Sequence, residues 1–364
     1  MHTTDQAHRV IFIDLMRAIA VLQMVQGHTV DVLLSSDLRT TELPAFAVWH
    51  FLRGMTAPIF MFTAGTVFTY LFHSVKKPFE QNYRVKKGIR RALLLLFLGY
   101  LMKYPTWTVV DFSEVTPDKL KLFFSVDVLQ LIGVSLLIVL LILFVTEKLK
   151  LNYTVTFTVV ASIFFFISPF TEKINWISIF AEPFAAYFYG GTGSLFPLFP
   201  WSGYVISGGV LGCYLAQNPL VFKTSRFSML LAIFGAVFTF VAIVSEKILI
   251  DLQILLINPQ TEPNTIFYRM GFVLLLTSLV SYISLKVNHI PYLIILAGRN
   301  TLLIYIVHLI ILYGSTWSPG LNLLWGYSFS GWLSFLAAVT MILLMTVMVK
   351  VIHKFKIRNK ELVT

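Results

Sequence analysis

Long apolar segments recur along the chain, with polar residues gathered between them. Each segment has about 20 residues and few charges, which is the length that an α-helix needs to cross a bilayer. Ten segments fit this description, near residues 10–32, 46–72, 89–104, 126–146, 152–170, 195–216, 227–246, 266–285, 290–314 and 330–352. The pattern predicts an all-α integral membrane protein, a bundle of about ten transmembrane helices. No linker rich in Pro, Gly or Ser divides the chain, so we expect one polytopic membrane domain over residues 1–364.

The basic residues between the segments predict the orientation. With ten spans both termini share one side, and that side carries 18 of the 28 Lys and Arg, against six on the other. Cytoplasmic loops are enriched in these residues, so we expect both termini in the cytoplasm. The first segment contains Asp14 and Arg17, so we expect it to remain as a transmembrane helix rather than to be a cleaved signal. Together these features predict a multi-pass protein of the cytoplasmic membrane.

Composition narrows the class of protein further. Only 12% of the residues are charged and 57% are hydrophobic, whereas soluble domains carry about 25% charged residues. This excludes a soluble enzyme, a disordered chain and a nucleic-acid-binding module, and the net charge of +11 is explained by basic cytoplasmic loops. The single Cys213 excludes an internal disulfide. We expect no metal site, because no clustered Cys, His or carboxylate ligands occur at metal-binding spacings.

The first segment carries a polar stripe. At 100° per residue, Asp14, Arg17 and His28 lie within about 60° of one another on a helix, with Asp31 one turn beyond His28. Arg17 belongs to the predicted cytoplasmic half, and His28 lies about 16 Å further toward the outer side. Ionisable residues inside a membrane are costly and usually mark a functional site. A purely structural ion pair between Asp14 and Arg17 is the alternative for those two residues.

Other polar residues fall at the two predicted membrane depths. Arg299 and Asn300 match the depth of Arg17, and His308 follows near the outer end of the same segment. These positions predict a polar path between the first and ninth helices, with Arg at the cytoplasmic end and His at the outer end. Further outer-side candidates are Arg53, Asp127 and Arg269. Snorkelling of the two Arg and helix capping or solvation at Asp127 are the structural alternatives.

A basic run, Lys86-Lys87-Gly88-Ile89-Arg90-Arg91, opens the third segment. One interpretation is a charge cluster that sets topology beside anionic lipid. The other is a site for the phosphates of a charged cytosolic donor, because Arg side chains suit phosphate geometry.

These residues resemble a known family. Residues 13–20 lead to Gly27-His28, which leaves ten residues between Arg17 and His28 and is similar to the first-helix motif of the acyltransferase-3 family. Three further stretches resemble the branch named for heparan-α-glucosaminide N-acetyltransferase. They are residues 56–65, residues 196–201 with Gly208-Gly209, and residues 298–308.

The resemblance implies transfer of an acetyl or other short acyl group from cytosolic acyl-CoA. The acceptor would be a hydroxyl or amine of a sugar or glycan at the outer side. His28 would be the catalytic base. Arg17, Lys87, Arg90, Arg91, Arg299 and Asn300 would serve acyl-CoA, with Asp14 supporting them. Asp31, Arg53, Asp127, Arg269 and His308 would lie on the acceptor side.

Two alternatives stay open. The lysosomal branch of the family carries its catalytic His nearer the second helix, and here His50 is the candidate for that role. The rival class is a transporter or a lipid or glycan flippase, which would use the same buried Arg, Asp and His residues. The expected partners are the lipid bilayer, acyl-CoA and a glycan acceptor, and no nucleic acid. A homodimer is compatible with the sequence.

Overall fold

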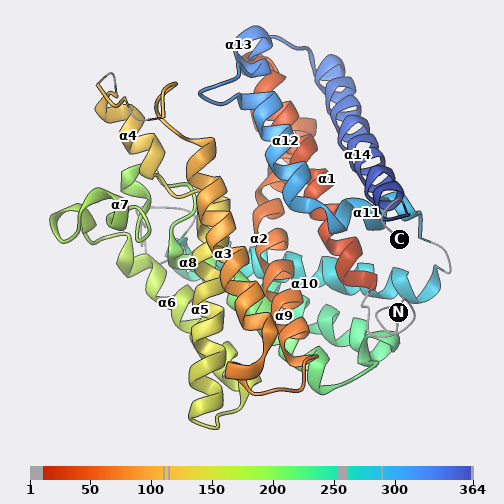
Figure 1. Ribbon diagram of the computed structural model, residues 1–364. Helices are drawn as coiled ribbons and strands as arrows, with labels where there is room; N and C mark the ends of the chain where they lie inside the picture. Colours follow the sequence, from red (N-terminus) through yellow and green to blue (C-terminus); the bar gives the residue numbers. More distant parts are fainter. Residues whose placement is uncertain (1–10, 110, 114, 252–260, 288–289, 362–364) are drawn as a thin grey trace. The chain divides into compact units, whose positions relative to one another are not determined.

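The computed structural model describes residues 11–109, 111–113, 115–251, 261–287 and 290–361. Residue 10, where the first predicted segment begins, lies outside the described residues. The chain divides into two compact helical units (Figure 1). Unit 1 comprises the described residues up to Phe60 and from Lys286 onward, and unit 2 comprises Met61–Leu285. One long helix, α2 (Pro44–His73), belongs partly to each unit.

Unit 1 is organised around α1 (Ile11–Leu33). This helix packs against α11 (Tyr292–Arg299), α12 (Thr301–Tyr313) and α14 (Gly331–Glu361). The short α13 (Leu321–Trp325) precedes a loop whose backbone joins the end of α1, because the amide of Phe329 donates to the carbonyl of Leu33 at 2.8 Å. The first helix is therefore held on several sides by the C-terminal part of the chain.

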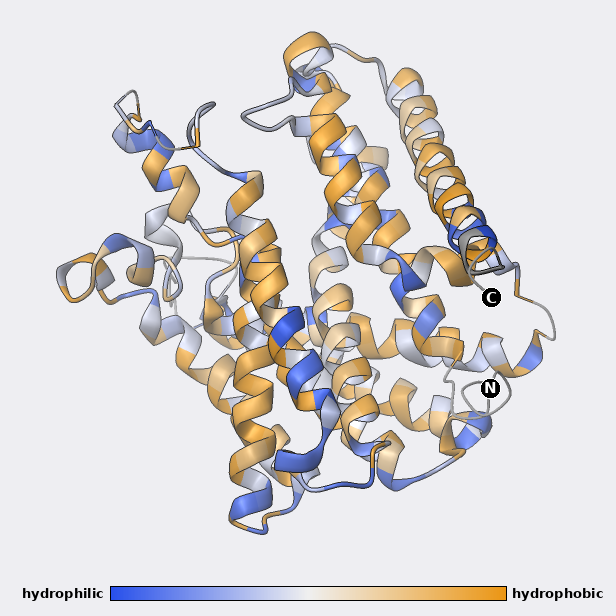
Figure 2. Ribbon diagram, viewed as in Figure 1, coloured by the Kyte–Doolittle hydropathy of each residue, from blue (hydrophilic) through white to orange (hydrophobic). Residues whose placement is uncertain are grey.

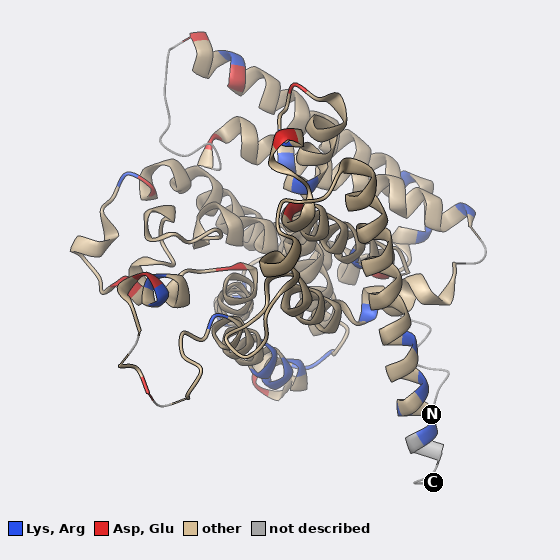
Figure 3. Ribbon diagram, turned by 90° about the horizontal axis from the view of Figure 1, so that it is seen from above, with Lys and Arg blue, Asp and Glu red and all other residues tan. Residues whose placement is uncertain are grey.

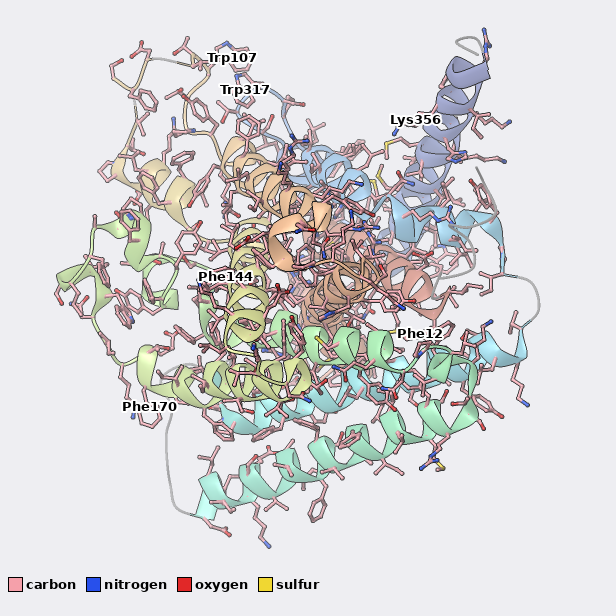
Figure 4. All side chains as sticks on the ribbon, turned by 60° about the horizontal axis from the view of Figure 1, so that its bottom comes forward. Phe12, Trp107, Phe144, Phe170, Trp317 and Lys356 are labelled. Atoms are coloured by element: carbon pink, nitrogen blue, oxygen red, sulfur yellow. The ribbon has the colours of Figure 1, made fainter. Side chains whose placement is uncertain are left out.

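Unit 2 contains the remainder of α2 and a set of long apolar helices. The helix pairs α3–α5 and α6–α8 form its main contacts, and α5 also packs on α8. Phe144 of α5, labelled in Figure 4, packs edge-on against Phe79 in the loop before α3. The helices are α3 (Tyr83–Met102), α4 (Pro117–Phe124), α5 (Val128–Lys148), α6 (Tyr153–Thr171), α7 (Glu182–Ala185), α8 (Leu198–Gln217), α9 (Ser225–Asp251) and α10 (Pro263–Lys286).

All ten predicted segments coincide with helices in the described residues, but they are not equally apolar. Six helices are long and apolar enough to cross a membrane: α2, α5, α6, α9, α10 and α14. The apolar character of α5 and α14 is plain in Figure 2. The predicted segments 10–32, 89–104 and 195–216 correspond to α1, α3 and α8, which are not among the six. Charges in α1 and α3, and Gly and Ser in α8, account for their lower hydropathy. The count of ten spans stays a prediction.

The ninth predicted segment, 290–314, is not one straight helix. It consists of α11 and α12, which meet at a 79° bend. Asn300 lies at the junction with φ −110° and ψ 29°, values outside the helical range. A sharp change of direction needs such a local interruption of the helical hydrogen bonds. If the pair counts as one broken span, the described residues contain seven candidate spans.

In unit 2, α2 and α8 approach so closely that their backbones touch. A Cβ atom added at Gly65 would collide with the backbone carbonyl of Val205, and one at Gly208 would collide with that of Phe62. Thr69 adds a hydrogen bond from its hydroxyl to the carbonyl of Gly209 at 3.2 Å. Small residues that permit such proximity are the usual basis of helix association in membranes.

Candidate active site

The polar stripe of α1 faces α11 and α12, as the sequence predicted. At one end, Arg17 donates from Nη2 to Oγ1 of Thr301 at 3.1 Å. Arg299 lies beside Asp14, with Nε 3.9 Å from Oδ2. Asn300 donates from its side chain to the carbonyl of Leu296 at 2.8 Å. These five residues, Asp14, Arg17, Arg299, Asn300 and Thr301, are called the Arg17 cluster below.

Two histidines meet further along α1. Nδ1 of His28 lies 3.1 Å from Nε2 of His308, which is on α12. The other ring nitrogen of His308, Nδ1, lies 2.7 Å from the carbonyl oxygen of Ile304 one turn earlier. His308 is fully buried, whereas His28 is partly exposed. The pair thus joins a fully buried histidine to a partly exposed one.

Beyond the histidines, an ionic group surrounds Asp31. Nη2 of Arg53 lies 2.6 Å from Oδ2 of Asp31, and Nη1 of Arg39 lies 3.7 Å from Oδ1. The hydroxyl of Tyr313 donates to Oδ2 at 3.5 Å, and the ring of Tyr313 meets the ring of His28 edge-on with 5.9 Å between centroids. His28, Asp31, Arg53, His308 and Tyr313 are called the His28 cluster below.

Both clusters lie within unit 1, so the predicted contact between the first and ninth helices is observed. Arg53 makes an ion pair with Asp31, where snorkelling was the alternative. Arg39 and Tyr313 were missed by sequence reasoning. A loop Arg and a Tyr at a helix end are common features of membrane proteins, so no signal in the sequence set them apart.

His50, the alternative base, has a different environment. Its side chain is exposed on α2, and its ring stacks on Phe46 of the same helix with 5.7 Å between centroids. No other polar or ring contact of His50 is present among the described residues. Among the described residues, His28 contacts a buried histidine and His50 does not.

The predicted donor-binding residues of α3 form an exposed basic face in unit 2. Lys87, Arg90 and Arg91 are all exposed. The helix begins at Asn82, whose side chain accepts from the amide of Arg84 at 3.0 Å. Nζ of Lys87 lies 4.8 Å from the ring centroid of Tyr83. A second exposed basic stretch, with Lys356 labelled in Figure 4, occupies the last turns of α14 (Figure 3).

Asp127 and Arg269, the remaining acceptor-side predictions, also lie in unit 2. Asp127 forms a capping box with Gln130 at the start of α5 and lies 3.5 Å from Nζ of Lys103. Capping, the structural alternative, is therefore confirmed for Asp127. The guanidinium of Arg269 is buried over the ring of Trp201 at 4.9 Å, so Arg269 does not snorkel. Their acceptor-side roles stay predictions.

Among the described residues, no three His, Cys, Asp or Glu side chains come together as metal ligands would. The expectation of no metal site stays a prediction. The chemistry that these clusters can perform is proton transfer through histidine and electrostatic binding of anionic groups through arginine.

A comparison with protein families identifies one match. Residues 9–250, about two thirds of the chain, match the family described as heparan-alpha-glucosaminide N-acetyltransferase, catalytic. This match confirms the predicted resemblance to that family, and the resemblance to the acyltransferase-3 family stays a prediction. No curated protein sequence matches the chain significantly. The matched residues include His28 and Arg17 but end before α11 and α12, which supply their partners.

Proposed function

Because the chain belongs to the heparan-α-glucosaminide N-acetyltransferase family, we propose that this multi-pass membrane acetyltransferase moves an acetyl group from cytosolic acetyl-CoA to a hydroxyl or amine of a glycan at the outer side of the membrane. The observation that carries the proposal is the contact between His28 and His308 within a helix bundle. Intramembrane histidines with a built hydrogen-bond partner are suited to proton transfer.

In the proposed reaction His28 is the general base. It accepts the proton of the acceptor hydroxyl or amine as the oxygen or nitrogen attacks the thioester carbonyl of acetyl-CoA. The new C–O or C–N bond forms, the C–S bond breaks, and the CoA thiolate leaves. The proton on His28 then passes to the departing sulfur. Asp31 and Arg53 would orient the acceptor beside His28, since both lie in the same cluster and are partly exposed.

Two basic groups are proposed to bind the donor. In unit 1, Arg17, Arg299 and Asn300 of the Arg17 cluster would hold the polar part of acetyl-CoA, with Asp14 keeping Arg299 in position. In unit 2, the exposed Lys87, Arg90 and Arg91 are proposed as phosphate-binding residues, for which Arg and Lys are suited. With both termini in the cytoplasm, the Arg17 end of α1 faces the cytosolic donor and the His28 end faces the acceptor.

The experiment is an assay of acetyl transfer by the full chain in vesicles. Radiolabelled acetyl-CoA is supplied on the side of the termini, and a glucosamine-ended oligosaccharide is supplied on the other side. We expect labelled oligosaccharide together with one free CoA thiol for each acetyl group transferred. Free thiol without labelled oligosaccharide would mean that the acceptor class is wrong.

A transporter or flippase is the second candidate, and the bend between α11 and α12 is the observation that favours it. Broken helices near the middle of the membrane are typical of transporters. Thermal unfolding of the detergent-solubilised protein separates the two candidates. Acetyl-CoA at about 100 times its dissociation constant should stabilise an acetyltransferase by about 2.7 kcal/mol. An unchanged Tm with acetyl-CoA would favour the transporter.

A further inference from the structure

Both ring nitrogens of His308 have a hydrogen-bond partner, and the two partners differ in kind. Nδ1 lies 2.7 Å from the carbonyl oxygen of Ile304, and Nε2 lies 3.1 Å from Nδ1 of His28. The planes of the two rings differ by only 15°, and their centroids are 5.3 Å apart. The distance of 3.1 Å between Nε2 of His308 and Nδ1 of His28 is much shorter than the 5.3 Å between the ring centroids. The two nitrogens therefore point at each other along the line that joins the rings.

The Ile304 carbonyl determines which nitrogen of His308 carries hydrogen. A carbonyl oxygen can only accept, so Nδ1 of His308 must be the N–H. His308 is fully buried, and a buried imidazolium would cost several kcal/mol without a compensating negative charge. His308 is therefore neutral, and its Nε2 holds a lone pair.

The same reasoning extends to His28. The lone pair on Nε2 of His308 needs a donor, and the atom that faces it is Nδ1 of His28. When Nδ1 of a neutral imidazole carries the hydrogen, Nε2 holds the lone pair. The hydrogen bonds thus lead from one backbone carbonyl, through His308, to an unprotonated Nε2 on His28.

We propose that His308 is a positioning residue that fixes the tautomer of His28, so that Nε2 of His28 is the atom that accepts the acceptor's proton. This inference rests on the proposed function. When Nε2 takes up that proton, His28 becomes an imidazolium whose Nδ1–H still donates to His308. The proton leaves again from Nε2 to the CoA sulfur, and His308 exchanges no proton in the cycle. It differs from the carboxylate partner of serine hydrolases in being uncharged.

The first test is spectroscopic and needs no turnover. The full chain, labelled with ¹⁵N in the imidazole rings of its eight His, is studied in nanodiscs at neutral pH, and His28→Gln assigns the His28 signals. We expect a protonated Nδ1 and an unprotonated Nε2 on His28. In His308→Leu we expect this preference to disappear. A protonated Nε2 on His28 in the unsubstituted protein would overturn the inference.

The second test compares two substitutions of His308. The amide oxygen of Gln can replace Nε2 as the acceptor for His28, whereas Leu has no acceptor. We expect His308→Leu to lower kcat about 10- to 100-fold, the loss typical when the partner that orients a histidine is removed. His308→Gln should retain kcat within a few-fold, and KM for acetyl-CoA should change in neither. Equal loss of kcat in both variants would overturn the inference.

Failure of the inference and failure of the proposed function give different results. If His308→Leu does not fold, the tautomer in the unsubstituted protein and in His308→Gln still decides the inference. Nε2 of His28 could prove to be protonated while acetyl transfer still depends on His28. That result would contradict the proposed role of His308 but not the proposed function. Absence of acetyl transfer from the unsubstituted protein contradicts the proposed function, whatever the tautomer.

Discussion

The contact of α1 with α11 and α12 in unit 1 and the contact of α2 with α8 in unit 2 both include a close approach of backbones at glycine, because a Cβ atom at Gly298 of α11 would collide with the carbonyl of Asp14. They differ in the number of polar side chains that join the helices. The first is bridged by side-chain polar groups: Arg17 with Thr301, Asp14 with Arg299, and His28 with His308. The second is made by glycines that bring two backbones together. Glycine contacts are sufficient to associate apolar helices, so polar groups that are costly in a membrane are not needed for packing alone. The polar side chains of unit 1 are therefore available for the proposed chemistry.

The largest effect should come from the polar contact. We predict that His28→Ala lowers kcat for acetyl transfer about 100- to 10,000-fold, the usual contribution of a general base. Binding of acetyl-CoA, measured by isothermal titration, should be retained because His28 is not among the donor-binding residues.

His50→Ala is the matched control for His28→Ala. His50 is exposed and packs only on Phe46 among the described residues, so its removal should leave kcat within a few-fold. Loss of kcat in His50→Ala with normal kcat in His28→Ala would move the base to His50.

A substitution in the glycine contact between α2 and α8 should change the stability of the protein. We predict that Gly208→Ala destabilises the protein by about 1–3 kcal/mol, the cost of forcing an extra methyl group into a closely packed contact. Gly54→Ala is the matched control, because a Cβ at Gly54 meets nothing within 4 Å. Thermal unfolding in detergent should show a lower Tm for Gly208→Ala alone. Equal Tm values for the two variants would mean that α2 and α8 do not depend on this proximity.

Donor binding should depend on both basic groups. Arg17→Ala removes a guanidinium that is proposed to bind the donor. A hydrogen bond to a charged group contributes about 1.5–3 kcal/mol, so we predict an acetyl-CoA dissociation constant about 10- to 100-fold higher. Arg90→Ala should weaken binding less, because Arg90 is exposed and water screens its charge. Lys356→Ala, which removes an exposed charge from α14, is the control in the same titration. Unchanged affinity in both Arg variants would leave Arg17 and Arg90 as structural charges.

The smallest effect is expected at Asp127. Loss of the N-cap in Asp127→Ala should cost about 1 kcal/mol of stability. Since capping is the role that the structure gives this residue, kcat and KM for the glycan should stay unchanged in the acetyl-transfer assay. A raised KM for the glycan with unchanged Tm would restore Asp127 to the acceptor side.

Much of the polar contact could be predicted from the sequence, because helical periodicity alone places Asp14, Arg17 and His28 on one face. Matching depths on the first and ninth segments predicted a polar path between the two helices, with His at its outer end, but not the direct contact of His28 with His308. The break at Asn300 was not predicted: the polar run Gly298-Arg299-Asn300-Thr301 interrupts the apolar segment, but no Pro marks a bend there. The ion pair of Arg39 with Asp31 depends on the path of the chain after α1, which periodicity does not determine.

The bend between α11 and α12 limits where this part of the chain can lie in a bilayer. The 13 residues of α12 rise about 20 Å, which is less than the hydrocarbon thickness of about 30 Å. At 79°, α11 runs nearly crosswise to α12 and adds little height. If α12 follows the membrane normal, at least one of its ends must therefore stop within the hydrocarbon layer or at its edge. Exposed peptide groups are not tolerated against lipid tails. The side chains that surround such an end must therefore keep its peptide groups out of contact with the lipid tails.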